Sequence, residues 1–414
     1  MSFLVTGGSP LYGSVSLRGA KNAALPILFA SLLCQDSVTL CRLPQIGDVE
    51  VAIGLLKSLG VQVEKKGVGL SFDTQSARAP TEALGETGKI RASSYLLGAS
   101  LGRFGEGEIA LPGGCALGAR PLNLHRFVFE AFGAVVEQTE TKISVRAKSL
   151  HPVCVRLPFP SVGATVNFLL TAMGAEGESR LYGYAAEPHV ADLIGFLCAM
   201  GADIKKQGDC LSVRGGIPLH GGDYSIISDG VEAGTYLLAA AMAGGDVTVS
   251  PLENGELLSL TEPLLRMGFE IQEKEGSLRL VSRGASRYKG VDIVASPYPA
   301  FPTDLHPPFA ALLCGAKGKG SVTDTVWHDR FAYAEELTKM GALVKRKNNR
   351  VFIRGTSLHG AEMCAPDLRG GAALLVAALG AVGDSLIHGE QVIKRGYEDV
   401  VGTLRALGGS VREV

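Results

Sequence analysis

A pattern that occurs six times along the chain constrains its fold more than any other feature. Each copy is a helix-like stretch that ends in glycine and is followed at once by a strand-like stretch, as in LLKSLGVQVE and LTKMGALVK. A glycine directly after a helix is the usual left-handed cap. The six marker glycines are spaced 67 to 73 residues apart: Gly60, Gly133, Gly201, Gly268, Gly341 and Gly408.

A second element recurs upstream of each marker glycine. It is a run of small and apolar residues, such as NAALPILFASLL or GGAALLVAALGA, and it precedes a short β-rich segment such as SVTL or DSLI. These runs lack the polar stripe of a surface helix, so they predict helices that are buried on nearly all sides. We therefore expect an α/β protein of six repeated units, with buried central helices, outer sheets and right-handed crossovers.

Length and charge limit the classes of protein to which the chain can belong. With 414 residues it is too long for one ordinary core, so two domains are expected. The 40 basic and 41 acidic residues give no reason to expect nucleic acid or an anionic membrane as a partner. The longest apolar stretches, residues 23–34 and 370–382, are shorter than the roughly 18 to 20 residues that span a bilayer. The N-terminus lacks the pattern of a secretory signal, so we expect a cytoplasmic protein.

The eight cysteines indicate a reducing compartment. They form no CxxC pair, and most stand in apolar runs, as Cys34, Cys198 and Cys314 do, where we expect small buried side chains. The cysteines and the eight histidines also lack the spacing of zinc ligands, so no metal site is expected.

Polar residues stand directly before the buried helices. Some are common N-cap residues: Asp229, Thr303 and Asp367. Others are cations, which oppose the helix macrodipole at this end: Lys21, Arg91 and Arg369. A bound anion would remove that conflict, because helix N-termini and cations both attract phosphate. The pattern therefore favours an anion-binding site where the helix starts meet.

The segment LPGGCALGARP, from Leu111 to Pro121, differs from the other cysteine contexts. Its two prolines and three glycines predict a mobile loop. Arg120 lies near Cys115 in sequence, and a nearby cation together with partial exposure makes a thiol more reactive. The alternative is an ordinary loop thiol with no role in chemistry.

With these motifs assembled, the chain resembles the UDP-N-acetylglucosamine enolpyruvyltransferases (1-carboxyvinyltransferases) of the EPSP synthase-like superfamily. The resemblance rests on segments that occur in order along the whole chain: GAKNAALPILFASLL from Gly19, RASSYLLG from Arg91, LPGGCALGARPLNLH from Leu111, SVGAT from Ser161, FPTDL from Phe301, DLRGGAALL from Asp367 and KRGYEDV from Lys394. It implies a two-domain inside-out α/β barrel with three repeats in each domain. One domain would consist of residues 1–20 and 229–414, and the other of residues 21–228, including the Cys115 loop.

The resemblance also implies an activity. It is the transfer of enolpyruvyl from phosphoenolpyruvate to the 3-hydroxyl of UDP-N-acetylglucosamine, with release of phosphate, as the first committed step of peptidoglycan synthesis. The reaction would be an addition followed by an elimination, through a tetrahedral intermediate. It needs no metal or organic cofactor, and the expected protein is a monomer or a weak homo-oligomer.

By motif position, four residues are expected to carry the chemistry. Cys115 would protonate the methylene carbon of phosphoenolpyruvate or form an adduct with it, and Asp304 would act as base toward the sugar hydroxyl. Lys21 and Arg395, with Arg120, would hold the phosphate and carboxylate of phosphoenolpyruvate. An N-cap role for Asp304 is the alternative.

A larger set is implied to face the substrates or to brace the site. Arg330 would assist with the anion, and a surface ion pair is the alternative for both Arg330 and Arg395. Asp367 and Arg369 would form a charge pair between the domains. The complete substrate-facing set is Lys21, Asn22, Arg91, Arg120, Pro121, Leu122, Asn123, Leu124, His125, Ser161, Val162, Gly163, Asp304, Val326, Arg330, Asp367, Arg369 and Arg395.

The chain departs from the family pattern at several positions near the expected site. Phe159 and Gly230 stand where the family commonly has a lysine and an arginine, and His189 replaces a glutamate. Two alternatives therefore stay open. One is a related enzyme with another acceptor, of the shikimate-phosphate type, and the other is a sugar-nucleotide sensor without catalysis.

Overall fold

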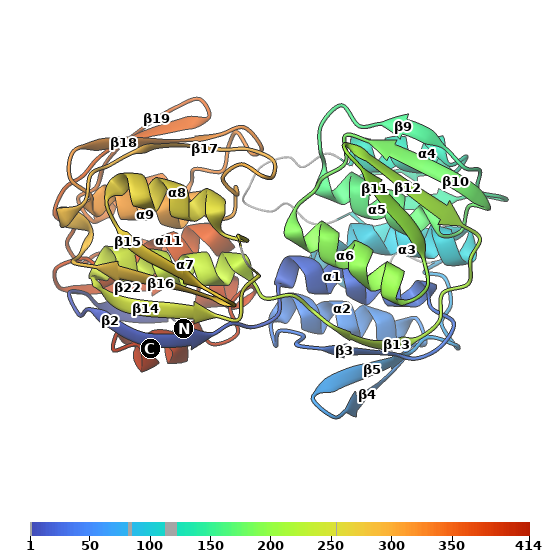
Figure 1. Ribbon diagram of the computed structural model, residues 1–414, viewed down its shortest axis with the longest axis horizontal. Coiled ribbons are helices and arrows are strands. Elements are labelled where there is room, and N and C mark those ends of the chain that lie inside the picture. Colours follow the sequence, from blue (N-terminus) through green and yellow to red (C-terminus); the bar gives the residue numbers. More distant parts are fainter. Residues whose placement is uncertain (1, 82–84, 112–121, 254) are drawn as a thin grey trace. The chain divides into compact units, whose positions relative to one another are not determined.

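The computed structural model describes residues 2–81, 85–111, 122–253 and 255–414, which divide into two compact units (Figure 1). Met1–Arg18 and Ser228–Val414 form what we call the discontinuous unit. The described residues from 19 to 227 form what we call the inserted unit. The domain boundaries expected from the sequence, at residues 20/21 and 228/229, differ from this division by one or two residues.

The inserted unit contains the first three repeats. Its buried helices are α1 (Lys21–Ala30), α3 (Ser94–Phe104) and α5 (Val162–Ala172), and its amphipathic helices are α2 (Gly47–Ser58), α4 (Asn123–Ala131) and α6 (Pro188–Ala199). Short 3₁₀ turns lie at Ser31–Leu33, Gly85–Lys89 and Arg91–Ser93. Its strands are β3 (Val38–Cys41), β4 (Gln62–Lys66), β5 (Gly69–Asp73), β6 (Glu106–Ala110), β7 (Val135–Gln138), β8 (Lys142–Arg146), β9 (Cys154–Arg156), β10 (Gly177–Tyr182), β11 (Asp203–Gln207), β12 (Cys210–Gly215) and β13 (Gly222–Ser225).

The discontinuous unit contains the other three repeats. Its buried helices are α7 (Gly230–Ala243), α9 (His306–Gly315) and α11 (Leu368–Leu379), and its other helices are α8 (Leu258–Met267), α10 (Tyr333–Lys339), α12 (Glu390–Lys394) and α13 (Val400–Ala406). A 3₁₀ turn lies at Ala285–Arg287. Its strands are β1 (Ser2–Thr6), β2 (Leu11–Ser16), β14 (Gly245–Ser250), β15 (Glu270–Lys274), β16 (Ser277–Ser282), β17 (Asp292–Ala295), β18 (Lys319–Asp324), β19 (Leu343–Lys347), β20 (Arg350–Arg354), β21 (Glu362–Cys364), β22 (Asp384–His388) and β23 (Ser410–Glu413).

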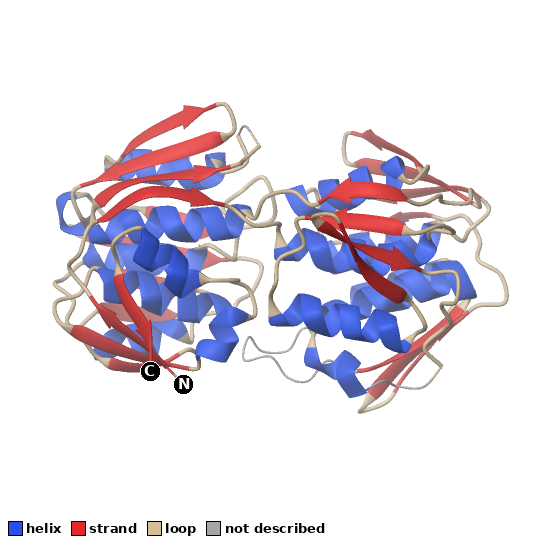
Figure 2. Ribbon diagram, turned by 90° about the horizontal axis from the view of Figure 1, so that it is seen from below, coloured by secondary structure: helices blue, strands red, loops and turns tan. Residues whose placement is uncertain are grey.

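The structure confirms the expected fold class. In each unit the helices lie inside and the small sheets lie outside (Figure 2). Most residues of the six helices expected to be buried are buried, from α1 to α11. All six marker glycines adopt a positive φ, between 83° and 104°, so the left-handed cap recurs in every repeat.

The sheets show how the repeats close within each unit. The inserted unit has the strand orders β13-β3-β5-β4, β6-β8-β7 and β11-β12-β10-β9. The discontinuous unit has β15-β16-β14-β2, β17-β18-β20-β19 and β21-β22-β1-β23. Strand β13 pairs in parallel with β3, and β2 pairs in parallel with β14. The N-terminal strand β1 lies antiparallel between β22 and β23, where it completes the sheet of the last repeat.

The cysteine environments agree only in part with the sequence analysis. Cys34 and Cys314 are fully buried, and burial raises the pKa of both thiols to about 12. Cys198 was wrongly expected to be buried, because it lies on the solvent-facing side of α6 and is exposed. Among the described residues, no group of His, Cys, Asp or Glu could hold a metal ion. No helix in the same part of the chain is long and apolar enough to cross a membrane.

Candidate functional site

In the discontinuous unit, the carboxylate of Asp304 lies between two arginines, just before helix α9. Nη1 of Arg330 donates a hydrogen bond of 2.7 Å to Oδ1, and Nε and Nη2 of Arg369 donate to Oδ2 at 3.2 and 3.1 Å. Both arginines are almost fully buried, whereas the Asp304 side chain keeps 23% of its accessible surface. Burial would raise the pKa of Asp304, but the two guanidinium groups hold it well below its usual value. Asp304 is therefore ionised and able to accept a hydrogen bond from a hydroxyl group.

Two of the three expected helix caps are confirmed. Asp229 accepts hydrogen bonds from two N–H groups at the start of α7, and Asp367 does the same at the start of α11. Thr303 was wrongly expected to be a cap, because α9 begins three residues later and the Thr303 hydroxyl donates instead to Oδ2 of Asp324 at 2.6 Å. Asp304 is not the N-cap residue of α9, because Leu305 occupies that position.

The expected charge pair between Asp367 and Arg369 is replaced by a different arrangement. The Asp367 carboxylate accepts from the backbone N–H groups of Arg369 and Gly370, at 2.9 and 3.0 Å. The Arg369 guanidinium pairs with Asp304 and stacks over the ring of Tyr397, 5.5 Å from its centroid. All these residues belong to the discontinuous unit. The sequence could not show this pairing, because 65 residues separate Asp304 from Arg369.

Two further predicted site residues belong to the same unit. Val326 follows β18, and its backbone N–H donates to Oδ1 of Asp324 at 2.7 Å. Arg395 directly follows α12 and is half-buried. For Arg330 the alternative expectation was an ion pair at the surface. Only 4% of its side chain is exposed, so its ion pair with Asp304 is internal.

In the inserted unit, Lys21 is the first residue of α1 and is buried. Its Nζ lies 2.7 Å from Oδ2 of Asp48, which stands in the first turn of α2. The cation at this helix start therefore has an internal carboxylate partner. From the sequence a bound anion was expected to offset this charge, and the Asp48 carboxylate was not predicted. An acidic residue in the first turn of the neighbouring amphipathic helix was the available signal.

A second group in the inserted unit contains Arg91, His125 and Gly163. His125 is buried in the first turn of α4, and burial together with the nearby Arg91 charge lowers its pKa to about 3. The ring is therefore neutral. Among the described residues, Nδ1 of His125 has no hydrogen-bond partner. A Cβ atom on Gly163 would lie 2.4 Å from two atoms of this ring, so only glycine fits there.

The remaining predicted residues of the inserted unit lie at helix starts. Ser161 is the N-cap of α5 and accepts a hydrogen bond of 3.3 Å from the N–H of Ala164. The others occupy N-cap or first-turn positions of α1, α4 and α5: Asn22, Leu122, Asn123, Leu124 and Val162. Three predicted residues lie outside the described part of the chain: Cys115, Arg120 and Pro121.

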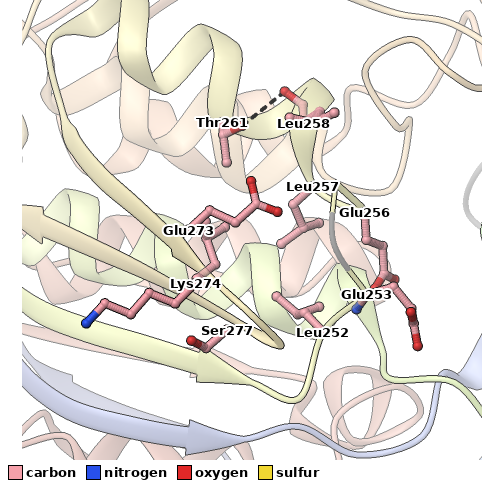
Figure 3. A pocket seen from close by; sticks show the side chains of 10 residues that line it. Leu252, Glu253, Glu256, Leu257, Leu258, Thr261, Glu273, Lys274 and Ser277 are labelled. Carbon is pink, nitrogen blue, oxygen red and sulfur yellow. Dashed lines mark hydrogen bonds between the residues drawn. The ribbon is translucent and has the colours of Figure 1, made fainter.

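The structure shows the environment of two positions at which the chain departs from the family pattern, Gly230 and Phe159. A Cβ atom on Gly230 would lie 2.7 Å from Oε1 of Glu256, so this carboxylate occupies the space that a side chain would need. Phe159 is 38% exposed. Glu256 also borders a small pocket, with Leu252 and Leu257 beside it (Figure 3). Its volume of about 10 Å³ holds no more than about one water molecule, so this pocket is no substrate site.

Comparison with known proteins gives a consistent result along the whole chain. Residues 5–404 match the family described as EPSP synthase (3-phosphoshikimate 1-carboxyvinyltransferase). A UDP-N-acetylglucosamine 1-carboxyvinyltransferase from Halothermothrix orenii is 40% identical over 417 residues, covering 100% of this chain and 99% of the relative. An enzyme of the same name from Clostridium botulinum is 41% identical over 411 residues, covering 98% of both chains.

Solved structures show the same architecture. The enolpyruvyl transferase NikO from Streptomyces tendae superposes with a TM-score of 0.90 at 25% identity, covering 100% of this chain and 98% of that one. An EPSP synthase from Acinetobacter baumannii superposes with a TM-score of 0.78 at 18% identity, covering 100% and 99%. The second likeness concerns the fold alone. The chain has the enolpyruvyl transferase fold.

Proposed function

The chain belongs to the EPSP synthase family, and on that premise we propose that it is a UDP-N-acetylglucosamine 1-carboxyvinyltransferase. It transfers the enolpyruvyl group of phosphoenolpyruvate to the sugar 3-hydroxyl of UDP-N-acetylglucosamine and releases phosphate, in peptidoglycan synthesis. The observation that carries this conclusion is the identity of about 40%, over the full length, to enzymes of that name.

Asp304 is the residue that we assign to the sugar hydroxyl. Its ionised carboxylate is partly exposed and is oriented from two sides by Arg330 and Arg369. Because these cations depress its pKa, Asp304 is a weak base toward a free hydroxyl. It accepts the proton as the hydroxyl oxygen bonds to C2 of phosphoenolpyruvate, when the hydroxyl becomes strongly acidic. Fixed partners of this kind keep the carboxylate in place during the reaction.

The addition step needs a proton for the methylene carbon of phosphoenolpyruvate, and we assign its delivery to Cys115. The methylene carbon becomes a methyl group while the sugar oxygen bonds to C2, which gives a tetrahedral intermediate. In the elimination step the methyl group loses a proton, the C2–O bond to phosphate breaks, and the enolpyruvyl ether remains. The assignment of Cys115 rests on its position in the LPGGCALGARP motif.

The anionic donor requires several cations, since it carries up to three negative charges. We assign its phosphate and carboxylate to Lys21, Arg120 and Arg395, with support from Arg330. The Lys21 ammonium lies at the start of α1, where the Asp48 carboxylate also contacts it. A helix N-terminus adds partial positive charge at the same place.

The nucleotide is assigned to the helix starts of the inserted unit. Arg91 supplies a cation there, and His125 and Gly163 form a close contact that fixes the starts of α4 and α5 relative to each other. A neutral His125 ring offers a hydrogen-bonding nitrogen without adding charge. A cytoplasmic location is part of the proposal, and the seven free thiols among the described residues support it.

The test is release of phosphate from phosphoenolpyruvate with each of two acceptors. We expect release with UDP-N-acetylglucosamine and none with shikimate 3-phosphate. Release with shikimate 3-phosphate alone would identify the other type of enolpyruvyltransferase. Binding of UDP-N-acetylglucosamine without release of phosphate would identify a sensor and overturn the proposal.

A further inference from the structure

Asp324 is a buried acidic residue to which neither the motifs nor the proposed chemistry assigns a role. It is the last residue of β18, and its side chain has no exposed surface. Oδ2 accepts the hydrogen bond of the Thr303 hydroxyl at 2.6 Å. Oδ1 accepts from the backbone N–H groups of Val326 and Trp327, at 2.7 and 2.9 Å. Asp324 therefore joins the segment before α9 to the loop that follows β18.

These two segments carry the residues that face each other at the candidate site. Thr303 directly precedes Asp304, and Trp327 stands three residues before Arg330. The Thr303 hydroxyl also accepts a hydrogen bond of 3.3 Å from Nη1 of Arg330, the same nitrogen that donates to Asp304. The hydroxyl thus bridges the Arg330 guanidinium and the Asp324 carboxylate.

Several titratable groups surround this bridge. Burial would raise the pKa of Asp324, but its partners, among them the His306 ring and the Thr303 hydroxyl, hold it below its usual value. His306 is fully buried, and Nε2 of its ring lies 3.0 Å from Oδ2 of Asp324. Burial lowers the pKa of His306 despite this contact, so the ring is neutral. The Asp304 carboxylate pairs with the guanidinium groups of Arg330 and Arg369, and the charges of Asp367 and Asp229 also act on this buried cluster.

We propose that Asp324, acting through Thr303, is a positioning residue that sets the geometry between Asp304 and Arg330 for the transfer step. The proposal rests on the proposed function, in which Asp304 meets the sugar hydroxyl. Without the bridge, the Asp324 carboxylate loses one donor, and the segment that carries Asp304 loses its hydrogen bond from Thr303 to β18. A displacement of about 1 Å at a reacting group lowers the rate by about 100-fold.

The test compares two substitutions of Thr303, one that removes the hydroxyl group and one that keeps it. Thr303→Val keeps the branched shape and removes the hydroxyl, whereas Thr303→Ser keeps the hydroxyl. Thr261→Val is the matched control, because Thr261 is a buried threonine of the same unit whose hydroxyl donates to Leu258. Phosphate release with phosphoenolpyruvate and UDP-N-acetylglucosamine gives kcat and both KM values for each variant.

We expect Thr303→Val to lower kcat by about 10- to 100-fold. Both KM values should stay within about threefold of the parent, because the proposal assigns the bridge to the transfer step. Thr303→Ser should restore kcat to within about threefold, and Thr261→Val should leave it unchanged. If Thr303→Val does not fold, as judged by its thermal transition, Asp324→Asn replaces it with the same expected split between kcat and KM.

Three outcomes would overturn the inference: an unchanged kcat in Thr303→Val, an equal loss in Thr303→Ser, or a loss confined to KM. An inactive parent protein would instead overturn the proposed function, so the two failures can be distinguished.

Discussion

Replacing Glu232 by glutamine should make the discontinuous unit more stable at neutral and alkaline pH. Glu232 lies in the first turn of α7 with 6% of its surface exposed. Its Oε2 accepts a hydrogen bond of 3.1 Å from the backbone N–H of Arg18. Burial, together with the nearby Asp229 charge, raises its pKa from 4.5 to about 7. The folded protein therefore disfavours the ionised form that the unfolded chain adopts above pH 4.5.

The size of the effect follows from this shift. A group whose pKa is raised on folding stabilises the folded state below its unfolded pKa, and that contribution is lost as the pH rises through the folded pKa. One unit of pKa corresponds to about 1.36 kcal/mol, so the full loss for Glu232 is about 3 kcal/mol. Most of it, about 2.5 kcal/mol, falls between pH 5 and pH 8. Glutamine keeps an oxygen for the Arg18 N–H group and removes the ionisation.

The assay is urea unfolding followed by tryptophan fluorescence. Trp327 is the only tryptophan of the chain and lies in the discontinuous unit, so its emission reports on the unit that contains Glu232. The advantage of Glu232→Gln over the parent should grow by about 2.5 kcal/mol from pH 5 to pH 8. Glu275→Gln, which removes an exposed carboxylate of the same unit, should show no such growth. A difference that is independent of pH, or that shrinks toward pH 8, would refute the reasoning.

Three other substitutions test separate parts of the proposal. Lys21→Met removes the buried ion pair with Asp48 and should lower the free energy of unfolding by about 3 kcal/mol, measured by urea titration; Lys21→Met with Asp48→Asn should recover most of it. Gly163→Ala places a Cβ atom against the His125 ring, so it should lower the free energy of unfolding by about 1 to 3 kcal/mol. It should also weaken the binding of UDP-N-acetylglucosamine, measured by calorimetry. Unchanged binding would show that the contact between Gly163 and His125 plays no part in binding the nucleotide. Cys115→Ser should slow phosphate release by at least about 100-fold and prevent inactivation by a thiol-directed epoxide, and continued inactivation would place the modified thiol elsewhere.

The repeat made the fold predictable from the sequence. Each marker glycine is a local signal, because a residue after a helix that must adopt a positive φ is usually glycine. The buried helices were equally predictable, because a helix formed by an apolar run without a polar stripe has no face suited to solvent and must be surrounded by the rest of the protein. The caps Asp229 and Asp367 followed from the same local chemistry. Cys198 was misassigned because an apolar run in an amphipathic helix still has one residue that faces solvent.

The candidate site was predictable only as a set of residues. Motif positions named Asp304, Arg330 and Arg369, but not which of them pair, because hydrogen-bond partners 26 and 65 residues apart leave no local pattern. Thr303 is a residue type that often caps helices, so a cap was predicted. Its actual hydrogen-bond partner, Asp324, could not be predicted, because the two residues meet only where the fold brings the end of β18 beside the start of α9. The roles of Cys115 and Arg120 remain predictions from their motif.

The position of β1 has a consequence for the order in which the chain can fold during synthesis. Its partners, β22 and β23, are the last strands to be made, and the backbone of Ser2 hydrogen-bonds to that of Val414 in both directions. At roughly 5 to 20 residues per second, the first strand waits roughly 20 to 80 s before β22 leaves the ribosome. The inserted unit has all its strands by then. Its folding can therefore precede the closure of the discontinuous unit, whose last sheet forms only when both ends of the chain are available.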